Sequence, residues 1–253
     1  MILVSETNSP VVLITGAAAG MGLTTANLLL ARGYRVIAID IDDAKLGSVL
    51  GAYGDDQVFK IKADLSKPDQ AVRAVRAGID HFGKLNALIN NAALHGKDWN
   101  GPCLDVSRED WERIFAVNVL AIPLLVGAAF PALAESKGVV INMSSMVGYG
   151  FGPSSPYAVS KAAVNGMTTS LAVELGPHGI RVVGVAPGFI TTPTSIAAVG
   201  DQAAQERLLS LQAMPEYGTP EDISEILEFL ISPRSRIITG TTVIADLGIT
   251  RRP

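Results

Sequence analysis

A run of apolar residues, Val11–Thr15, leads directly into three glycines at positions 16, 20 and 22, and the segment that follows favours a helix. In such a strand–turn–helix unit the first glycine permits a tight turn and the second lets the backbone approach a pyrophosphate. The third lets the helix pack on the strand. The helix N-terminus then faces the anion. The sequence therefore predicts that Gly16, Gly20 and Gly22 form the phosphate cradle of a dinucleotide-binding fold.

Strand-like and helix-like segments alternate along the rest of the chain. Near-continuous Val, Ile and Leu in the strands indicate a parallel sheet covered on both faces, and right-handed crossovers make it doubly wound. We expect an α/β, Rossmann-type sheet of about seven strands in a single domain spanning 1–253. The expected strands are 11–15, 34–40, 58–63, 85–91, 139–144, 180–186 and 241–246. The expected helices are 21–32, 43–53, 68–82, 108–133, 156–175 and 220–231. The irregular stretch 191–219 is interpreted as a substrate loop or lid.

Composition narrows the classes of partner. The net charge is −4 and the basic residues are scattered, which argues against nucleic acid and anionic membranes as partners. Cys103 is the single cysteine, so no intrachain disulfide can form and a reducing, cytoplasmic location is expected. The three histidines lack metal-ligand spacing, so no metal site is expected.

The stretch 114–134 carries no charge over 21 residues, which is long enough to span a bilayer. Asn118, two prolines and a glycine interrupt it, and the α/β pattern continues on either side. A helix buried on more than one side, at a subunit contact, is the better interpretation.

Asp40 ends the second expected strand, 24 residues after Gly16. A carboxylate there can accept hydrogen bonds from the ribose hydroxyls of adenosine. Its alternative role is to cap the next helix, which Asp42 or Asp43 could do instead. A carboxylate at this point repels a 2′-phosphate, so the sequence favours NAD over NADP.

Tyr157 and Lys161 lie four residues apart, about one helical turn, so their side chains meet on one face. Free tyrosine titrates near ~10, which is high for a group that exchanges a proton at neutral pH. A nearby ammonium favours the phenolate and lowers that pKa. The pair therefore predicts a proton-transfer site, and together with the dinucleotide cradle it predicts a redox enzyme.

These motifs together resemble the short-chain dehydrogenase/reductase family over essentially all of 11–248. The markers occur in the family's order: the glycine motif, Asp64, Asn90-Asn91-Ala92-Ala93, Asn118, Ser145, Tyr157-Ala-Val-Ser-Lys161 and Pro187-Gly188-Phe-Ile190-Thr-Thr192. Two positions depart from the family pattern. Ala93 replaces the usual glycine, and Leu247 stands in the usual Asp-Gly-Gly near the C-terminus.

The resemblance implies a catalytic set of Asn118, Ser145, Tyr157 and Lys161. Ser145 would bind the substrate oxygen, Tyr157 would move the proton, and Lys161 would lower the tyrosine pKa and bind the nicotinamide ribose. Asn118 would anchor a water in a relay to Lys161; its alternative is a buried amide bridging two helices. A common family spacing from Tyr157 reaches Ser144, but the local pattern Ser145-Met-Val-Gly148 favours Ser145.

The resemblance also implies the NAD contacts and a homotetramer. Asp64 and Leu65 would contact adenine, Asn91 the adjoining ribose, and Ile190 and Thr192 the carboxamide. The full expected set is Gly16, Ala19, Gly20, Met21, Gly22, Asp40, Ile41, Asp64, Leu65, Asn91, Ala92, Tyr157, Lys161, Pro187, Gly188, Ile190 and Thr192.

The expected substrate side is largely apolar and has no arginine near Ser145 to bind a carboxylate. A secondary alcohol or ketone on a hydrophobic skeleton, cyclic or not, fits best. Ser145, Val147, Tyr149, Tyr157 and His95 are its expected contacts, although a lone loop histidine is more often simply exposed. Further candidates are Leu94, Phe151, Pro153 and the loop 194–217.

Two other function classes remain open. A noncatalytic NAD-binding regulator is disfavoured by the intact serine, tyrosine and lysine. The second is a different reaction on the same fold, either epimerisation or enoyl reduction. Epimerisation is disfavoured because the longer epimerase-like relatives usually carry a larger C-terminal substrate domain than is expected here. Enoyl reduction is disfavoured because those relatives space tyrosine and lysine more widely.

Overall fold

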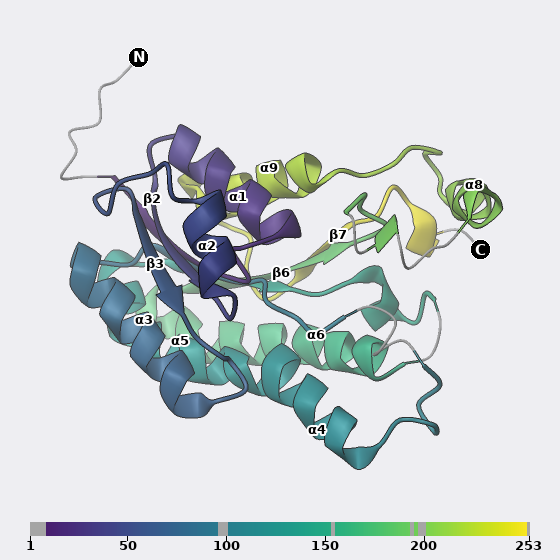
Figure 1. Cartoon of the computed structure of the whole chain (residues 1–253), viewed down its shortest axis with the longest axis horizontal. Coiled ribbons are helices and arrows are strands. Elements are labelled where there is room, and N and C mark those ends of the chain that lie inside the picture. The colour runs from purple at the N-terminus through teal and green to yellow at the C-terminus, as the bar shows by residue number, and fades with distance from the viewer. Residues whose placement is uncertain (1–8, 96–100, 153–154, 193–194, 197–200, 252–253) are drawn as a thin grey trace.

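The computed structural model describes residues 9–95, 101–152, 155–192, 195–196 and 201–251. These residues build one parallel sheet of seven strands in the order β3-β2-β1-β4-β5-β6-β7 (Figure 1). This is the expected α/β, Rossmann-type sheet. The strands are β1 Val11–Thr15, β2 Arg35–Asp40, β3 Val58–Lys62, β4 Ala87–Asn90, β5 Val139–Met143, β6 Arg181–Pro187 and β7 Thr242–Ala245.

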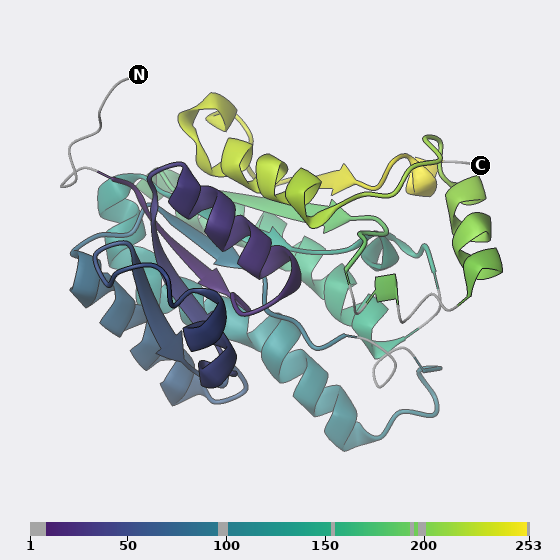
Figure 2. The same cartoon turned by 45° about the horizontal axis from the view of Figure 1, so that its top comes forward.

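Helices cover both faces of the sheet because each strand alternates its side chains between them. Val11 and Leu13 of β1 pack with the helices of one face, whereas Val12 and Ile14 pack with those of the other. The first face carries α3 (Pro68–Phe82), α5 (Ala121–Ser136) and α6 (Pro156–Leu175). The second carries α1 (Gly20–Ala31), α2 (Asp43–Val49) and α9 (Pro220–Ile231), as Figure 2 shows from a second angle. Two buried cores result, one on each side of the sheet.

The strand predictions agree with the structure to within two residues at each end, but three other predictions need correction, among them the helix 108–133. α2 ends at Val49, four residues before the expected end. The stretch 191–219 is not irregular throughout, because it contains α8, Gln202–Leu211. The Asp201 side chain accepts a hydrogen bond from the N–H of Ala204 and caps α8. That N-cap before a run of good helix formers was a signal available in the sequence.

The expected helix 108–133 is divided into three segments. α4 spans Arg108–Phe115, a π-helical turn spans Ala116–Leu120, and α5 continues from Ala121. Arg108–Ser136 has the length and composition to cross a bilayer, yet buried core helices of soluble proteins have the same properties. α5 packs against α3, and Leu125, Ala129 and Leu133 of α5 lie in the first core. The π-helical turn matters for the site because Asn118 is at its centre.

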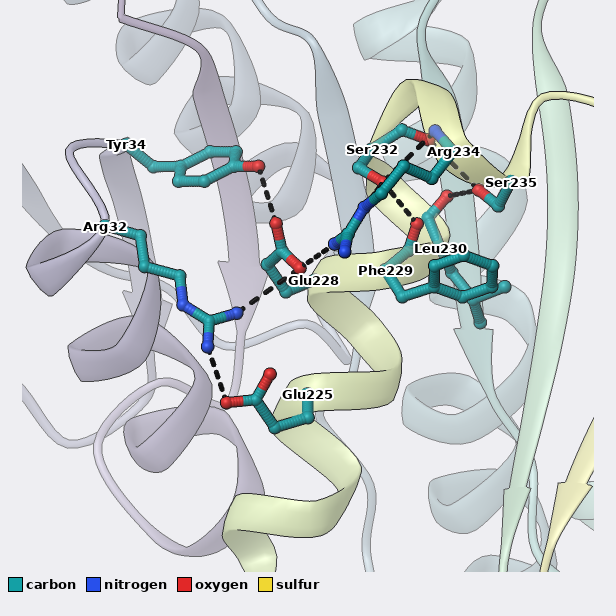
Figure 3. Close-up of polar contacts among 9 residues, drawn as sticks. All are labelled: Arg32, Tyr34, Glu225, Glu228, Phe229, Leu230, Ser232, Arg234 and Ser235. Carbon is teal, nitrogen blue, oxygen red and sulfur yellow. Dashed lines mark hydrogen bonds and ion pairs between the residues drawn. The ribbon is translucent and has the colours of Figure 1, made fainter. Parts of the chain in front are cut away.

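A polar cluster ties α9 to the end of α1 and the start of β2 (Figure 3). The Glu228 carboxylate accepts a hydrogen bond from the Tyr34 hydroxyl at 3.3 Å and lies 3.3 Å from the Arg32 guanidinium. Arg234 donates to the same carboxylate. The Glu228 side chain is 12% exposed, so its ion pairs are less screened by water than that of the half-exposed Glu225 with Arg32. The cluster holds α9 beside α1 on the second face.

The strand order places a topological switch between β1 and β4, because the chain leaves these neighbouring strands toward opposite faces of the sheet. Open α/β sheets bind ligands in the crevice outside the carboxyl ends of the strands at such a point. The glycine turn follows β1 and Asn91 follows β4, so both predicted cofactor segments meet there.

Candidate functional site

A cleft of about 670 Å³ opens at the switch point. It brings together predicted cofactor, catalytic and substrate residues from the ends of six strands and from α6. The predicted residues that line it are Gly16, Ala19, Gly20, Met21, Asp40, Ile41, Asp64, Leu65, Asn91, Ala92, Leu94, His95, Ser145, Tyr157, Lys161, Pro187, Gly188, Ile190 and Thr192.

The glycine turn is as close-packed as the motif predicts. Gly16 has φ +68°, in the left-handed region that glycine adopts without steric cost. A Cβ on Gly22 would lie 2.1 Å from the carbonyl oxygen of Gly16, so this position accepts no side chain. Gly22 is therefore a packing residue behind the cleft and does not line it.

The start of α1 fits an anionic group. Ala19 is the N-cap and has no side-chain acceptor for the first N–H groups of the helix. Ala19, Gly20 and Met21 line the cleft at this helix end. Unsatisfied N–H groups and the helix dipole favour a phosphate at such a position. The cleft thus suits the pyrophosphate of a nicotinamide dinucleotide, which would supply the hydride acceptor or donor.

Asn91 holds the glycine turn from behind. Its side-chain Nδ2 donates to the carbonyls of Thr15 at 2.9 Å and Gly16 at 3.3 Å. In return, the Thr15 hydroxyl accepts the N–H groups of Asn91 and Ala92, both at 3.0 Å. The Asn91 side-chain amide is thus already bound to the backbone of the glycine turn. The predicted contact of Asn91 with the ribose stays a prediction.

Asp40 lies at the predicted place and also braces the turn. Its carboxylate accepts the N–H of Ala18 at 2.9 Å and that of Asp42 at 3.1 Å. Asp42 caps α2 by accepting the N–H of Lys45, so Asp40 is not the helix cap. Asp40 remains in the cleft wall, where a further ribose hydrogen bond stays a prediction.

The two adjacent serines face different ways. The Ser144 side chain is buried and donates to the carbonyl of Lys161 at 3.2 Å. Ser145 makes a hydrogen bond with Tyr157, which acts to lower the tyrosine pKa. Ser145 therefore lies beside the predicted proton donor, whereas the Ser144 hydroxyl is occupied by the backbone.

Burial dominates the electrostatics of the tyrosine and lysine pair. It raises the pKa of Tyr157 to about 12 and lowers the pKa of Lys161 to about 8. Lys161 Nζ donates to the carbonyl of Met143 at 2.7 Å and lies 5.5 Å from the centre of the Tyr157 ring. Burial therefore keeps the pKa of Tyr157 high, and the lowering of that pKa by Lys161 stays a prediction. Ser145 supplies the lowering influence in this structure.

Asn118 bridges two elements through its buried amide. Its Oδ1 accepts the N–H of Leu94 at 2.8 Å, and its Nδ2 donates to the Leu94 carbonyl at 3.1 Å. Nδ2 also donates to Ser160 at 3.0 Å. A cavity of about 10 Å³, near the size of one water, is lined by Asn118 and Lys161. The Asn118 amide therefore joins the loop after β4 to α6, close to the alternative of a buried amide that bridges two helices. Its role in a water relay to Lys161 stays a prediction.

Some predicted residues lie elsewhere, and some residues of the cleft were not predicted. Val147, Tyr149 and Phe151 do not line the cleft. Pro153 and residues 193–194 and 197–200 of the expected lid lie outside the described residues. Arg113 of α4 and Lys45 of α2 also line the cleft, and no local motif marked them because distant segments bring them together. Ser195, which lines it too, belongs to the expected loop 194–217. The expectation that no arginine lies near Ser145 stays a prediction.

The segment 191–219 is fastened at two points. Thr191 donates to the Gly218 carbonyl through its N–H at 2.9 Å and its hydroxyl at 3.1 Å. The Leu247 carbonyl accepts the N–H groups of Ala213 at 3.0 Å and Met214 at 3.1 Å. Leu247 has φ +53°, a left-handed conformation that costs a leucine free energy and that glycine adopts readily. Leu247, which departs from the family's Asp-Gly-Gly, thus stands where a glycine would avoid this cost.

Comparisons with known proteins agree on one family. Residues 16–250 match a family model described as Enoyl-(Acyl carrier protein) reductase. The chain is 34% identical over 245 residues to the 3-oxoacyl-[acyl-carrier-protein] reductase FabG of Thermotoga maritima, covering 94% of this chain and 97% of that one. It is 31% identical over 256 residues to cyclohexanol dehydrogenase of an Acinetobacter species, covering 99% of both chains.

The crystal structure of 3-ketoacyl-(acyl-carrier-protein) reductase from Brucella melitensis complexed with NADH is similar throughout. It has a TM-score of 0.86 and 30% identity, with 96% of this chain and 99% of that chain covered.

The buried ammonium predicts a pH-dependent stability. Between pH ~8 and ~10.5 the folded chain has released the Lys161 proton while the unfolded chain still binds it. The unfolded state then binds more protons, so the unfolding free energy of the wild type rises with pH relative to Lys161→Met. From pH 7 to 9.5, urea titrations without cofactor should show a relative gain on the order of 1–2 kcal/mol. A difference that stays flat across this range would contradict the buried charge.

Proposed function

Because the chain belongs to the short-chain dehydrogenase/reductase family, whose oxidoreductases act on hydroxyl and keto groups with a nicotinamide cofactor, we propose that it interconverts a secondary alcohol and a ketone on a hydrophobic skeleton with NAD(H). The observation that carries this proposal is the grouping of Ser145, Tyr157 and Lys161 in the cleft that also contains the uncapped start of α1.

The proposed roles follow from the contacts. Ser145 and the Tyr157 hydroxyl hydrogen-bond the substrate oxygen, and Tyr157 donates its proton to that oxygen during reduction or accepts it during oxidation. Substrate contact at the phenol replaces its hydrogen bond with Ser145. Lys161, held by the Met143 carbonyl, keeps a positive charge near the phenol below its pKa of about 8. Its remaining N–H groups can bind the nicotinamide ribose.

The substrate class rests on the apolar character of the surroundings. Leu94, Ile190 and Met143 line the cleft together with the catalytic residues, and Ile196, Leu211 and Met214 of the lid are exposed. Similarity to a cyclohexanol dehydrogenase supports a cyclic alcohol or ketone as substrate. Enoyl reduction is the second candidate because the matching family model carries that description. The four-residue spacing of Tyr157 and Lys161 argues against it.

The choice of NAD rests on Asp40 in the cleft wall and on which cations approach it. Arg35 stacks on Phe82 at 5.0 Å and donates to the carbonyl of Ser9, so it lies at the far end of β2 from Asp40. Lys45 lines the cleft and opposes the effect of Asp40, because its ammonium could bind a 2′-phosphate. A phosphate at ~4 Å from a carboxylate is disfavoured by about 1 kcal/mol in water and about 4 near a protein surface.

Apolar side chains also remain exposed at the π-helical turn before α5 and on α6. Leu120 is 56% exposed and Val173 is 76% exposed. Contact between copies of the chain would bury them, which supports a homotetramer as the working assembly.

The catalytic assignment predicts a ranked set of losses. Tyr157→Phe should lower turnover by roughly 10²–10⁴ because it removes the transferred proton, while NADH affinity stays near that of the wild type. Ser145→Ala should lower kcat by about 10² because it removes a donor to the substrate oxygen. Ser144→Ala is the matched control and should lose less. Steady-state kinetics on a panel of hydrophobic ketones gives all three values, and near-native turnover of Tyr157→Phe or a larger loss in Ser144→Ala would refute the assignment.

The cofactor assignment predicts a preference for NADH over NADPH of roughly fivefold to a thousandfold in kcat/KM. Asp40→Asn keeps an acceptor for the Ala18 N–H but removes the charge, so the preference should shrink. Lys45→Ala should lower NADPH use further if Lys45 binds the phosphate. A wild-type preference for NADPH, or the same ratio in Asp40→Asn, would exclude Asp40 as the selector.

The assembly is checked by light scattering at micromolar concentration, where a tetramer mass is expected. Val173→Asp, on α6, should shift the mass toward smaller species because it places a charge in the contact. Leu104→Asp is the control, since Leu104 is 98% exposed in the loop before α4. A wild-type monomer, or equal behaviour of the two variants, argues against this interface.

A further inference from the structure

His95 and Tyr157 lie close together in the cleft, although they come from two different elements of the fold. Their ring centroids are 6.3 Å apart, with an angle of 50° between the planes. His95 comes from the loop after β4, and Tyr157 from the first turn of α6. Both side chains line the cleft, so a ligand that reaches the phenol also meets the imidazole.

The buried side-chain amide of Asn118 fixes the positions of His95 and Tyr157 relative to each other. Asn118 binds both the N–H and the carbonyl of Leu94, the residue before His95. The same amide donates to the hydroxyl of Ser160, which in turn donates to the carbonyl of Tyr157 at 2.7 Å. Asn118 and Ser160 are almost completely buried. The loop that carries His95 is therefore fixed relative to the helix that carries Tyr157, and the spacing of the two rings is set by the fold.

The surroundings keep His95 uncharged at neutral pH. Burial, and then the positive charge of Lys161, lower the pKa of His95 from its ordinary value. A neutral imidazole has one nitrogen that donates a hydrogen bond and one that accepts. More than a third of the residue is nevertheless accessible, and that part belongs to the cleft wall. An accessible neutral donor and acceptor therefore stands beside the predicted proton donor.

We propose that His95 and Tyr157 recognise two oxygens of one substrate, the reacting oxygen at Tyr157 and a second, uncharged oxygen at His95. The rings lie 6.3 Å apart, centroid to centroid, so the two oxygens belong to one small substrate, and the proposal places the second on a carbon one or two positions from the reacting carbon. A neutral imidazole offers no charge to balance a carboxylate, so the second group is a hydroxyl or a carbonyl. The substrate class is then an oxygenated ketone or its alcohol, such as a 2-hydroxyketone or a 3-oxo ester. The inference rests on the proposed function and makes His95 a specificity-determining residue.

The test compares ratios of kcat/KM within matched ketone pairs. One pair is 2-hydroxycyclohexanone and 2-methylcyclohexanone, and the other is ethyl 3-oxobutanoate and 2-hexanone. The wild type should favour the oxygenated member of at least one pair by about tenfold or more, the scale of one hydrogen bond to a substrate group. In His95→Phe, which keeps a ring but no hydrogen-bonding atom, that preference should fall by about tenfold. His95→Gln should retain most of it.

The within-pair ratio separates recognition from a structural effect. A loosened loop lowers both members of a pair equally and leaves the ratio unchanged. Unchanged ratios in His95→Phe, or equal losses for both members, overturn the proposal while the proposed function stands. No reduction of any of the four ketones by the wild type, with NADH or NADPH, overturns both. NADH affinity, followed by fluorescence, should be alike in the wild type and both variants.

Discussion

Thr15 and Asn91 hold the two central strands together at the edge where the cleft opens. Three side-chain-mediated bonds of 2.9 to 3.0 Å link the end of β1 to the segment after β4. These strands send the chain to opposite faces of the sheet, and their backbone pairing ends at Ile14 and Ile89, so this link continues the connection beyond the paired residues. The same amide also holds the glycine turn, because Asn91 donates a hydrogen bond to the Gly16 carbonyl. The start of α1, and with it the predicted phosphate site, is placed by this contact.

A second layer of contacts fixes the chemistry relative to that edge. Asn118 joins the loop after β4 to α6, and Lys161 of α6 is held by the end of β5. These hydrogen bonds thus fix the segments that carry the predicted proton donor, the lysine and His95. Fixed positions of this kind are what proton transfer requires, because the acid must lie within hydrogen-bond reach of the substrate oxygen.

Much of this arrangement could be predicted from the sequence. Buried parallel strands are almost uniformly apolar, so runs such as 36–39 and 139–141 identified the sheet directly. The glycine, serine, tyrosine and lysine motifs are local and located the cleft. What the sequence could not show depends on contacts between distant segments. Arg113 and Lys45 reach the cleft from helices with no distinguishing motif, and burial raises the pKa of Tyr157.

The π-helical turn at Asn118 has a consequence for how such a helix can change over time. The turn holds one more residue than an α-helical turn, so the faces of α4 and α5 are rotated relative to a continuous helix. A single deletion that restored α-helical geometry would turn the Asn118 amide away from Leu94 and Ser160 or shift all of α5 against α3. Single substitutions along α4 and α5 can therefore accumulate without changing this geometry. The number of residues between Ile114 and Ala121 cannot change, because the packed faces of α4 and α5 both depend on it.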